Sequence, residues 1–201
     1  MSTLESTVDK AAATVVPLHP LLARRWSSRA FDPDHEVTDE QLTALLEAAR
    51  WAPSASNTQP WRFAVTRRGT TEHATVLDTL AGGNQTWARD ASALVVVAAR
   101  TTGTDGAAQP WAVYDAGQAV AHLSVQAQAE GLAVHQMGGF DRDRLTTVLA
   151  AADVTPLVVV AVGLRDEPAR LAEPFAQRET AERVRLSVGE LLLPVRPQEG
   201  G

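Results

Sequence analysis

The chain has 201 residues, of which 45% are hydrophobic and 21% charged, and its formal net charge is -6. This is the composition of an ordinary globular protein with enough apolar side chains for one substantial core. The acidic balance argues against a nucleic-acid partner, which requires a basic face. The absence of cysteine excludes disulfides and thiol catalysis, and the five histidines lack the His-x-x-x-His spacing of a zinc site, so we expect no metal.

Residues 1–17 are polar and rich in Thr and Ala, and they lack the long apolar core of a signal peptide or membrane-spanning helix. The longest apolar runs, 91–99 and 157–162, are also too short to cross a membrane. We therefore expect residues 1–17 to form a flexible arm and residues 18–201 a single domain. We also expect a cytoplasmic protein with no membrane partner.

The first well-marked element is a helix that begins after Thr38. Thr38 and Gln41 form a capping box, and Leu42 and Leu45 lie on one apolar face. Pro53 ends this helix, so the polar loop that follows it is held by a rigid support.

Helix and strand signals then alternate along the chain. We expect, in order, a strand at 63–66, a helix at 71–80 ended by Gly82 and Gly83, a buried strand at 93–99, a helix at 113–130, a short strand at 132–134, a helix from Asp141 to about Ala151 and a strand at 157–163. The helix at 113–130 is rich in small residues, which allows close approach of its own sheet or of a symmetry mate. Prolines at 168, 174, 194 and 197 predict an irregular tail that wraps around another part of the structure. The alternation predicts a sandwich of helices and strands.

Arg25, Ser27 and Arg29 alternate along the chain, so in an extended segment their side chains leave on one side. Such donors suit a phosphate or an electron-rich carbonyl edge, although an isolated basic segment is more simply a solvated turn. A second segment, residues 53–61, carries Asn57 and Gln59, whose amides both donate and accept hydrogen bonds, as recognition of a heterocycle requires.

Two further segments fit a flat, phosphate-bearing ligand. Arg183 and Arg185 share one side if extended, and together with Arg25 they give three guanidinium groups for a ligand with nearly two negative charges. Gly138 and Gly139 lack a Cβ, so a ring can approach their backbone closely.

The two motifs at 25–32 and 53–61, in this order, resemble those of the flavin-dependent nitroreductase family, whose members hold FMN with such segments. The resemblance covers His19 to about Leu193. It implies an α+β fold, a three-layer α/β/α sandwich with a central mixed, mostly antiparallel sheet, in an interlocked homodimer whose C-terminal tail wraps the partner subunit. It implies that FMN is held by the following residues: Arg25, Trp26, Ser27, Arg29, Pro53, Ser54, Ala55, Ser56, Asn57, Gln59, Gln136, Met137, Gly138, Gly139, Arg183 and Arg185.

The resemblance also implies an oxidoreductase that passes electrons from NADH or NADPH through flavin N5 to a nitroaromatic, quinone or similar flat acceptor. No side chain acts as a nucleophile in such a reaction. Because no Gly-x-Gly-x-x-Gly segment follows a strand, there is no separate dinucleotide domain, and we expect donor and acceptor to alternate in a ping-pong mechanism. The fold also hosts dehydrogenases, dehalogenases and flavin-fragmenting enzymes, and a non-catalytic FMN-binding protein is a further alternative. His135 either faces the substrate pocket or is simply packed.

Overall fold

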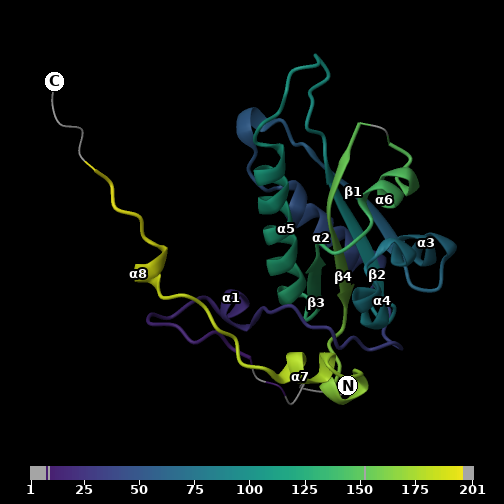
Figure 1. The fold of residues 1–201 in the computed structure, drawn as a ribbon, viewed down its shortest axis with the longest axis vertical. Helices are drawn as coiled ribbons and strands as arrows, with labels where there is room; N and C mark the ends of the chain where they lie inside the picture. The colour runs from purple at the N-terminus through teal and green to yellow at the C-terminus, as the bar shows by residue number, and fades with distance from the viewer. Residues whose placement is uncertain (1–7, 9, 152, 197–201) are drawn as a thin grey trace.

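The computed structural model describes residues 8, 10–151 and 153–196 (Figure 1). Its helices and strands follow in chain order: α1 (Pro20–Arg24), α2 (Asp39–Arg50), η1 (Ala55–Asn57, a 3-10 turn), β1 (Trp61–Arg67), α3 (Thr71–Thr79), α4 (Gly82–Ala88), β2 (Ala93–Ala99), α5 (Ala112–Ala129), β3 (Ala133–Met137), α6 (Arg142–Val148), β4 (Thr155–Gly163), η2 (Pro168–Arg170, also 3-10), α7 (Phe175–Thr180) and α8 (Val188–Leu191).

The strands form one sheet in the order β1-β2-β4-β3. Every pairing among them is antiparallel, so the described sheet is more uniform than the mixed sheet expected. All seven residues of β2 are buried, because β1 and β4 flank the strand and helices cover both of its faces. Its odd-numbered side chains pack on one side and most of the even-numbered ones on the other, as the period of two in a strand requires.

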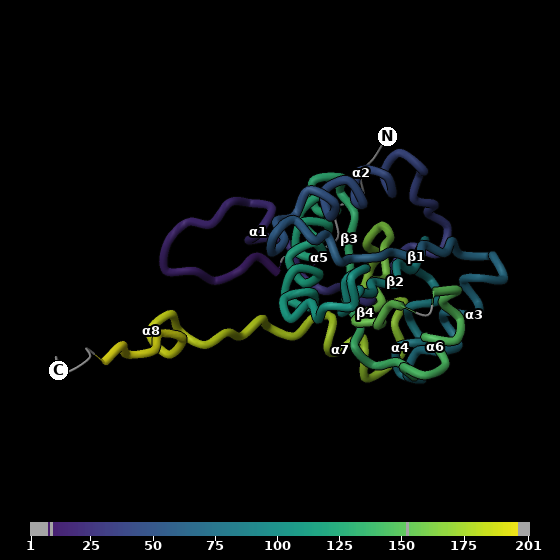
Figure 2. The backbone as a smooth tube through the Cα atoms, turned by 90° about the horizontal axis from the view of Figure 1, so that it is seen from above, coloured from purple at the N-terminus to yellow at the C-terminus, as the bar shows by residue number. Residues whose placement is uncertain are grey.

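Helices cover both faces of this sheet, which confirms the expected α+β sandwich (Figures 1 and 2). On one face, α2 and α5 pack with residues such as Val95, Val97 and Leu123. On the other, α3, α4 and α6 pack with Leu94, Val96 and their neighbours. The protein therefore has three layers, with the sheet in the middle.

Local sequence signals place several elements correctly. The capping box of Thr38 and Gln41 is present at the start of α2, and α5 and the buried strand β2 lie where the pattern predicts them. The helix expected at 71–80 is α3, which stops at Thr79, but Gly82 and Gly83 do not form a loop after it, because a second helix, α4, begins at Gly82. Both glycines lie in the first turn, where backbone N–H groups need no intrahelical partner.

Other bounds differ from those expected. β1 and β4 are longer than the predicted strands, and α6 ends at Val148, before the predicted end near Ala151. β3 runs on to Met137, whereas the sequence pattern ended it at 134. α1, and the short helices α7 and α8 within the proline-bearing tail, were not predicted.

The C-terminal tail leaves the body of the molecule and ends far from the sheet (Figures 1 and 2). Its apolar side chains are largely exposed, including 74% of Val184, 89% of Leu193 and 92% of Val195. Of the expected N-terminal arm, residues 1–7 and 9 lie outside the described part, and Lys10 is tied to the tail through Nζ, which donates to the Glu179 carbonyl oxygen at 2.9 Å. No helix within the described residues is long and apolar enough to span a membrane.

Candidate cofactor site

Residues 25–31, called segment 25–31 below, run in extended form past the end of β4. Trp26, Ser28 and Ala30 are buried, whereas Arg25, Ser27 and Arg29 lie on the outer side. Phe31 forms an isolated antiparallel bridge with Arg165, and the Asp166 N–H donates to the Ala30 carbonyl at 3.0 Å. The predicted alternation is therefore confirmed, and the three polar side chains face away from the core together.

A buried carboxylate holds the inner side of this segment. Glu179 of α7 is only 1% exposed, and its Oε1 accepts hydrogen bonds from Ser28 Oγ at 2.5 Å, Arg29 N at 3.0 Å and Ala30 N at 3.3 Å. Its Oε2 lies 3.0 Å from Arg29 N. Segment 25–31 is thus fixed through its backbone, which leaves the Arg29 side chain free to meet a ligand.

His135 holds the same segment from β3. Its Nδ1 lies 3.0 Å from the Ser28 carbonyl oxygen, and because a carbonyl only accepts, Nδ1 carries the proton and donates. Burial, assisted by the charge of Arg29, lowers the pKa of His135 to about 4, and its ring packs against Trp87 with centroids 4.5 Å apart. Of the two alternatives for His135, the structure supports packing and hydrogen bonding within the fold.

Trp26 is anchored by two cations. The Lys10 ammonium lies 4.5 Å and the Arg165 guanidinium 4.9 Å from its ring centroid, and the indole is only 6% exposed. Such contacts stabilise a buried aromatic ring. The Trp26 side chain therefore belongs to the framework of the site, and only its backbone is available to a ligand.

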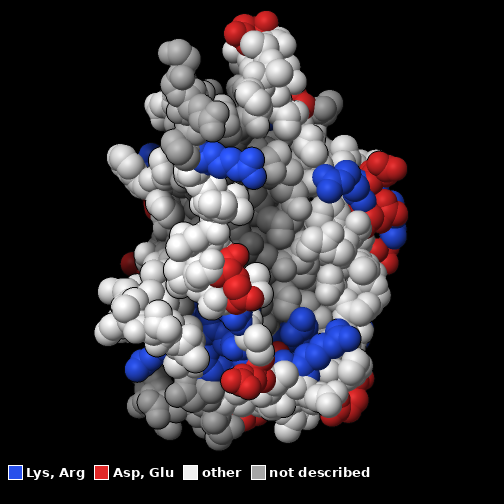
Figure 3. Space-filling view, turned by 60° about the vertical axis from the view of Figure 1, so that its left-hand side comes forward, with Lys and Arg blue, Asp and Glu red and all other residues white. Residues whose placement is uncertain are grey.

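Arg183 and Arg185 of the tail lie close enough to Arg25, the first residue of segment 25–31, for their charges to act on it. We call these three residues the arginine cluster. Arg183 donates to the carbonyl oxygens of Lys10 at 2.6 Å and Ala23 at 3.0 Å. Burial lowers the pKa of Arg25, and the charges of Arg183 and Arg185 lower it further. Figure 3 shows basic side chains gathered at the end of the molecule where α1 and α7 lie.

Within the described part of the chain, no member of the arginine cluster forms an ion pair with a carboxylate. Like charges held together without a counter-charge favour binding of an anion, and a phosphate dianion with several acceptor oxygens matches three guanidinium groups. The residues present therefore fit the phosphate of a cofactor. The same described residues contain no group of His, Cys, Asp and Glu that could hold a metal ion.

Residues 53–61, called the amide loop below, are shaped mainly by their own backbone. Ser56, Asn57 and Gln59 have positive φ values of 51°, 56° and 46°, and all three are exposed. The loop is tied to α5 by one contact, in which Ala55 N donates to Oδ2 of the buried Asp115 at 3.0 Å. The amide side chains of Asn57 and Gln59 thus project from a preformed turn at the surface.

Residues 136–139, at the end of β3 and just after it, were expected to lie against the cofactor, and their environments differ. Met137 is 2% exposed and its side chain packs in the core beside α3 and α4, so only its backbone is available to a ligand. Gln136 is exposed and its amide donates to Ser124 Oγ at 3.1 Å. A Cβ on Gly139 would meet Asn84 Nδ2 at 3.1 Å, whereas one on Gly138 would meet open space. Glycine at 139 therefore serves packing against α4, and Gly138 faces outward.

The structure brings together one half of the predicted site and separates the other. Segment 25–31 lies beside the residues just after Gly163, the last residue of β4, and this end of the sheet is also the Ala93 end of β2. The amide loop leads into Trp61, which pairs with Ala99 at the opposite end of β2. The seven residues of β2 span roughly 20 Å between these ends. Within one chain, the arginine cluster and the amide loop lie on different ends of the sheet.

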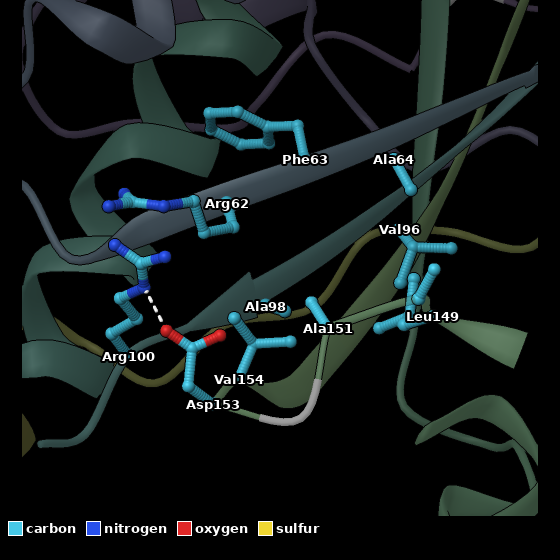
Figure 4. A pocket seen from close by; sticks show the side chains of 11 residues that line it. Arg62, Phe63, Ala64, Val96, Ala98, Arg100, Leu149, Ala151, Asp153 and Val154 are labelled. Carbon is cyan, nitrogen blue, oxygen red and sulfur yellow. Dashed lines mark ion pairs between the residues drawn. The ribbon is translucent and has the colours of Figure 1, made fainter. Parts of the chain in front are cut away.

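A cavity of about 260 Å³ opens near the amide-loop end, on the sheet face that α6 covers (Figure 4). Its apolar floor includes Val96 and Leu149, and Arg62 and Arg100 project from one side of it. Arg100 Nε lies 2.5 Å from Asp153 Oδ2, so this arginine already has a counter-charge. The cavity contains none of the predicted cofactor residues and lies apart from the arginine cluster.

Sequence reasoning missed the residues that support the site from behind. Ser28, Asp115 and Glu179 are all buried polar side chains whose partners are distant in sequence. Their local patterns resemble those of ordinary polar positions in a strand or helix. Only the alternation of segment 25–31 carried a signal, since it placed Ser28 on the inner side.

Comparison with known proteins points to the family that the two motifs of this chain resemble, and the similarity covers most of the chain. The sequence profile described as "Nitroreductase family" matches residues 22–78 and 67–164. An uncharacterized 15.4 kDa protein of Mycolicibacterium smegmatis is 38% identical over 138 residues, which cover 65% of this chain and 92% of that protein. The protein DrgA of Synechocystis is 30% identical over 200 residues, covering 84% and 91% of the two chains.

Solved structures agree in fold. A crystal structure described as an oxidoreductase containing FMN has a TM-score of 0.84 and 34% identity, and the match covers 92% of this chain and 94% of that one. Matches of this extent establish the assignment. The chain belongs to the nitroreductase family.

Proposed function

We propose that this protein is an FMN-dependent oxidoreductase that takes electrons from NADH or NADPH and passes them to a nitroaromatic, a quinone or a similar flat acceptor. The observation that carries the proposal is the arginine cluster, which has no carboxylate partner among the described residues and lies beside the outward-facing Ser27 and Arg29. A structure 34% identical to this chain is described as containing FMN, and this description supports the choice of anion.

Each part of the site has a role in this proposal. The arginine cluster and Ser27 would hold the phosphate and ribityl oxygens, and the positive charge of Arg29 would favour the negative charge that the flavin ring gains on reduction. Asn57 and Gln59 hydrogen-bond the ring edge, and Gly138 permits close approach of the backbone. When bound, the flavin supplies the hydride-accepting position N5, and the protein supplies position, charge and exclusion of water.

We infer that the complete site needs two copies of the chain. The amide loop and segment 25–31 lie at opposite ends of the sheet of one chain, separated along it by about the length of the seven-residue strand β2, roughly 20 Å. The tail leaves the body with exposed Val184, Leu193 and Val195, which need an apolar partner surface. α5 also presents the exposed Val113 and Tyr114 on its outer side. A homodimer in which the tail embraces the partner, and the partner's amide loop reaches the flavin, accounts for these features together.

The electron donor and the acceptor share one flavin face in this proposal. Because the sequence contains no separate dinucleotide-binding segment, the nicotinamide must leave before the acceptor enters. Initial rates over a grid of both substrates should give parallel double-reciprocal lines. Intersecting lines would indicate a ternary complex and a separate nicotinamide site.

The decisive experiment is identification of the bound ligand. We expect the purified protein to be yellow and to release about one FMN per chain on heating, identified by mass spectrometry. Absence of flavin, together with no binding of added FMN, would refute the proposal. Bound FMN without oxidation of either nicotinamide would favour a dehydrogenase with a specialised substrate or a non-catalytic flavin-binding protein.

A further inference from the structure

The buried carboxylate of Glu179 lies between the two parts of the chain that supply the arginine cluster. It accepts hydrogen bonds from Ser28 Oγ, Arg29 N and Ala30 N, a few residues after Arg25. An ionised carboxylate that is 1% exposed is costly to bury unless its oxygens are satisfied, and here both oxygens have donors. The contact therefore fixes α7 of the tail against segment 25–31.

The same helix leads directly to the other two arginines. Arg183 and Arg185 follow Glu179 by four and six positions, so the place at which α7 docks determines where they emerge. Lys10 connects Glu179 with Arg183 by two further hydrogen bonds. Lys10 Nζ donates to the Glu179 carbonyl at 2.9 Å, and Arg183 donates to the Lys10 carbonyl at 2.6 Å. Glu179 thus joins the backbone segments that carry Arg25 and the Arg183–Arg185 pair.

This connection matters because the cluster opposes its own assembly. Three guanidinium groups repel one another, and the charges of Arg183 and Arg185 lower the pKa of Arg25. Without a contact that holds their backbones together, they would separate until an anion arrived, and binding would carry the cost of reassembling them. A site held ready in advance avoids this cost.

We propose that Glu179 is a positioning residue that preorganises the arginine cluster, and that through it the protein prefers FMN to riboflavin, which lacks the phosphate. This inference rests on the proposed function. Glu179 does not touch the phosphate in it, because its oxygens already face Ser28, Arg29 and Ala30.

The test compares FMN with riboflavin on the full-length protein stripped of flavin. Fluorescence titrations with each ligand give an affinity ratio for the wild type and for Glu179→Gln. Positioning predicts that FMN affinity falls about tenfold or more in the variant while riboflavin affinity changes far less, so the ratio collapses. Loss of a negative charge beside Lys10 and Arg29 would by itself tighten binding of the FMN dianion, so the two explanations predict opposite signs of the change in FMN affinity.

Glu173→Gln provides the matched control, because it removes the same charge from an exposed position of the same tail. We expect its affinity ratio to equal or slightly exceed that of the wild type. If Glu179→Gln does not fold, Ser28→Ala removes one donor to the carboxylate and leaves the charge, and it should lower the ratio about two- to fivefold. An unchanged or increased ratio in whichever variant folds would overturn the inference.

The two failures remain distinguishable. A wild-type protein that binds neither FMN nor riboflavin would refute the proposed function itself. A wild-type protein that prefers FMN, with variants that keep this preference, would leave the function standing and remove only the role of Glu179.

Discussion

Segment 25–31 and the amide loop are both parts of the candidate site, yet they are held in shape by different means. Segment 25–31 is fixed by contacts with His135 and Glu179, 107 to 151 residues away in the chain. In the amide loop, Gln59 N bonds Ser54 Oγ five residues away and Asn57 N bonds the Ser54 carbonyl. Its distant ties are the hydrogen bond from Ala55 N to Asp115 and the one from Arg100 N to the Pro60 carbonyl. The first therefore depends on the whole fold, and the second mainly on its own dihedral angles.

The largest expected effect concerns pH and His135, which holds segment 25–31. Its pKa is about 4 in the folded protein and near 6.5 when exposed, so between these values the unfolded chain binds a proton that the folded chain does not. Its stabilising contribution is complete above pH 6.5 and is lost as the pH falls to 4, on the order of 3 kcal/mol. Urea unfolding at several pH values should show a steeper acid loss for the wild type than for His135→Gln. The exposed His122→Gln serves as control, and equal slopes in all three proteins would assign the acid sensitivity to other groups.

The next largest effect is on FMN affinity and concerns Arg25 of segment 25–31 and Arg185 of the tail. Arg25→Ala and Arg185→Ala should each weaken FMN binding about ten- to a hundredfold, since each removes a charge-assisted hydrogen bond worth about 1.5–3 kcal/mol. Turnover of enzyme that still carries FMN should change less. Flavin titration measures the affinity, with Arg89→Ala, directly after α4, as a control for loss of an exposed arginine. Unchanged affinity in both variants would place the phosphate elsewhere.

A smaller effect is expected at the hydrogen bond between the amide loop and Asp115 of α5. Asp115→Asn keeps an acceptor for Ala55 N but loses the charge, which should cost about 1 kcal/mol, the difference between a charged and a neutral hydrogen bond. Hydrogen exchange should become faster at the Ala55 amide and stay unchanged at the Arg29 amide. Acceleration at both amides would show that the two regions are not independent.

The smallest effect tests the dihedral restraint itself. Ser56 has φ 51° and ψ 26°, a left-handed conformation that costs a non-glycine residue about 1–2 kcal/mol, so Ser56→Gly should stabilise the protein by about 0.5 kcal/mol after the entropic cost of glycine. Thr58, two residues on, is right-handed with φ -69°, and Thr58→Gly should destabilise by about 0.5–1 kcal/mol. Chemical unfolding compares the two variants. Destabilisation of equal size in both would mean that the positive φ of Ser56 carries no strain.

The sequence was sufficient for features that depend on neighbouring residues. The capping box at Thr38, the apolar run of β2 and the alternation of Arg25 and Arg29 follow from spacing alone, and all are present. Features that depend on distant partners were not accessible. Gly82 begins a helix because α4 packs against the passage after β3, where Asn84 and the Ala81 N–H bond the Gly139 carbonyl, and no local pattern records that contact.

In the candidate site, too, residues recognisable by their type were predictable, and residues defined by distant partners were not. The arginines and amides that would touch a ligand could be listed in advance, because their chemistry is visible in the residue type. The core position of the Met137 side chain was not visible locally, because β3 continues past the predicted strand end. Glu179 was missed because a glutamate in a short helix looks like a solvated one until the fold closes around it.

The distance along the chain between Arg29 and Glu179 also sets an order of events during synthesis. The two residues are 150 positions apart. At about 5–20 residues per second, Arg29 is synthesised roughly 8–30 s before the carboxylate that fixes its segment. During that interval Ser28, Arg29 and Ala30 have no such partner, so a nascent chain that stops short of α7 cannot form the arginine cluster. Any ligand that depends on this segment must therefore be captured after almost the whole chain has been translated.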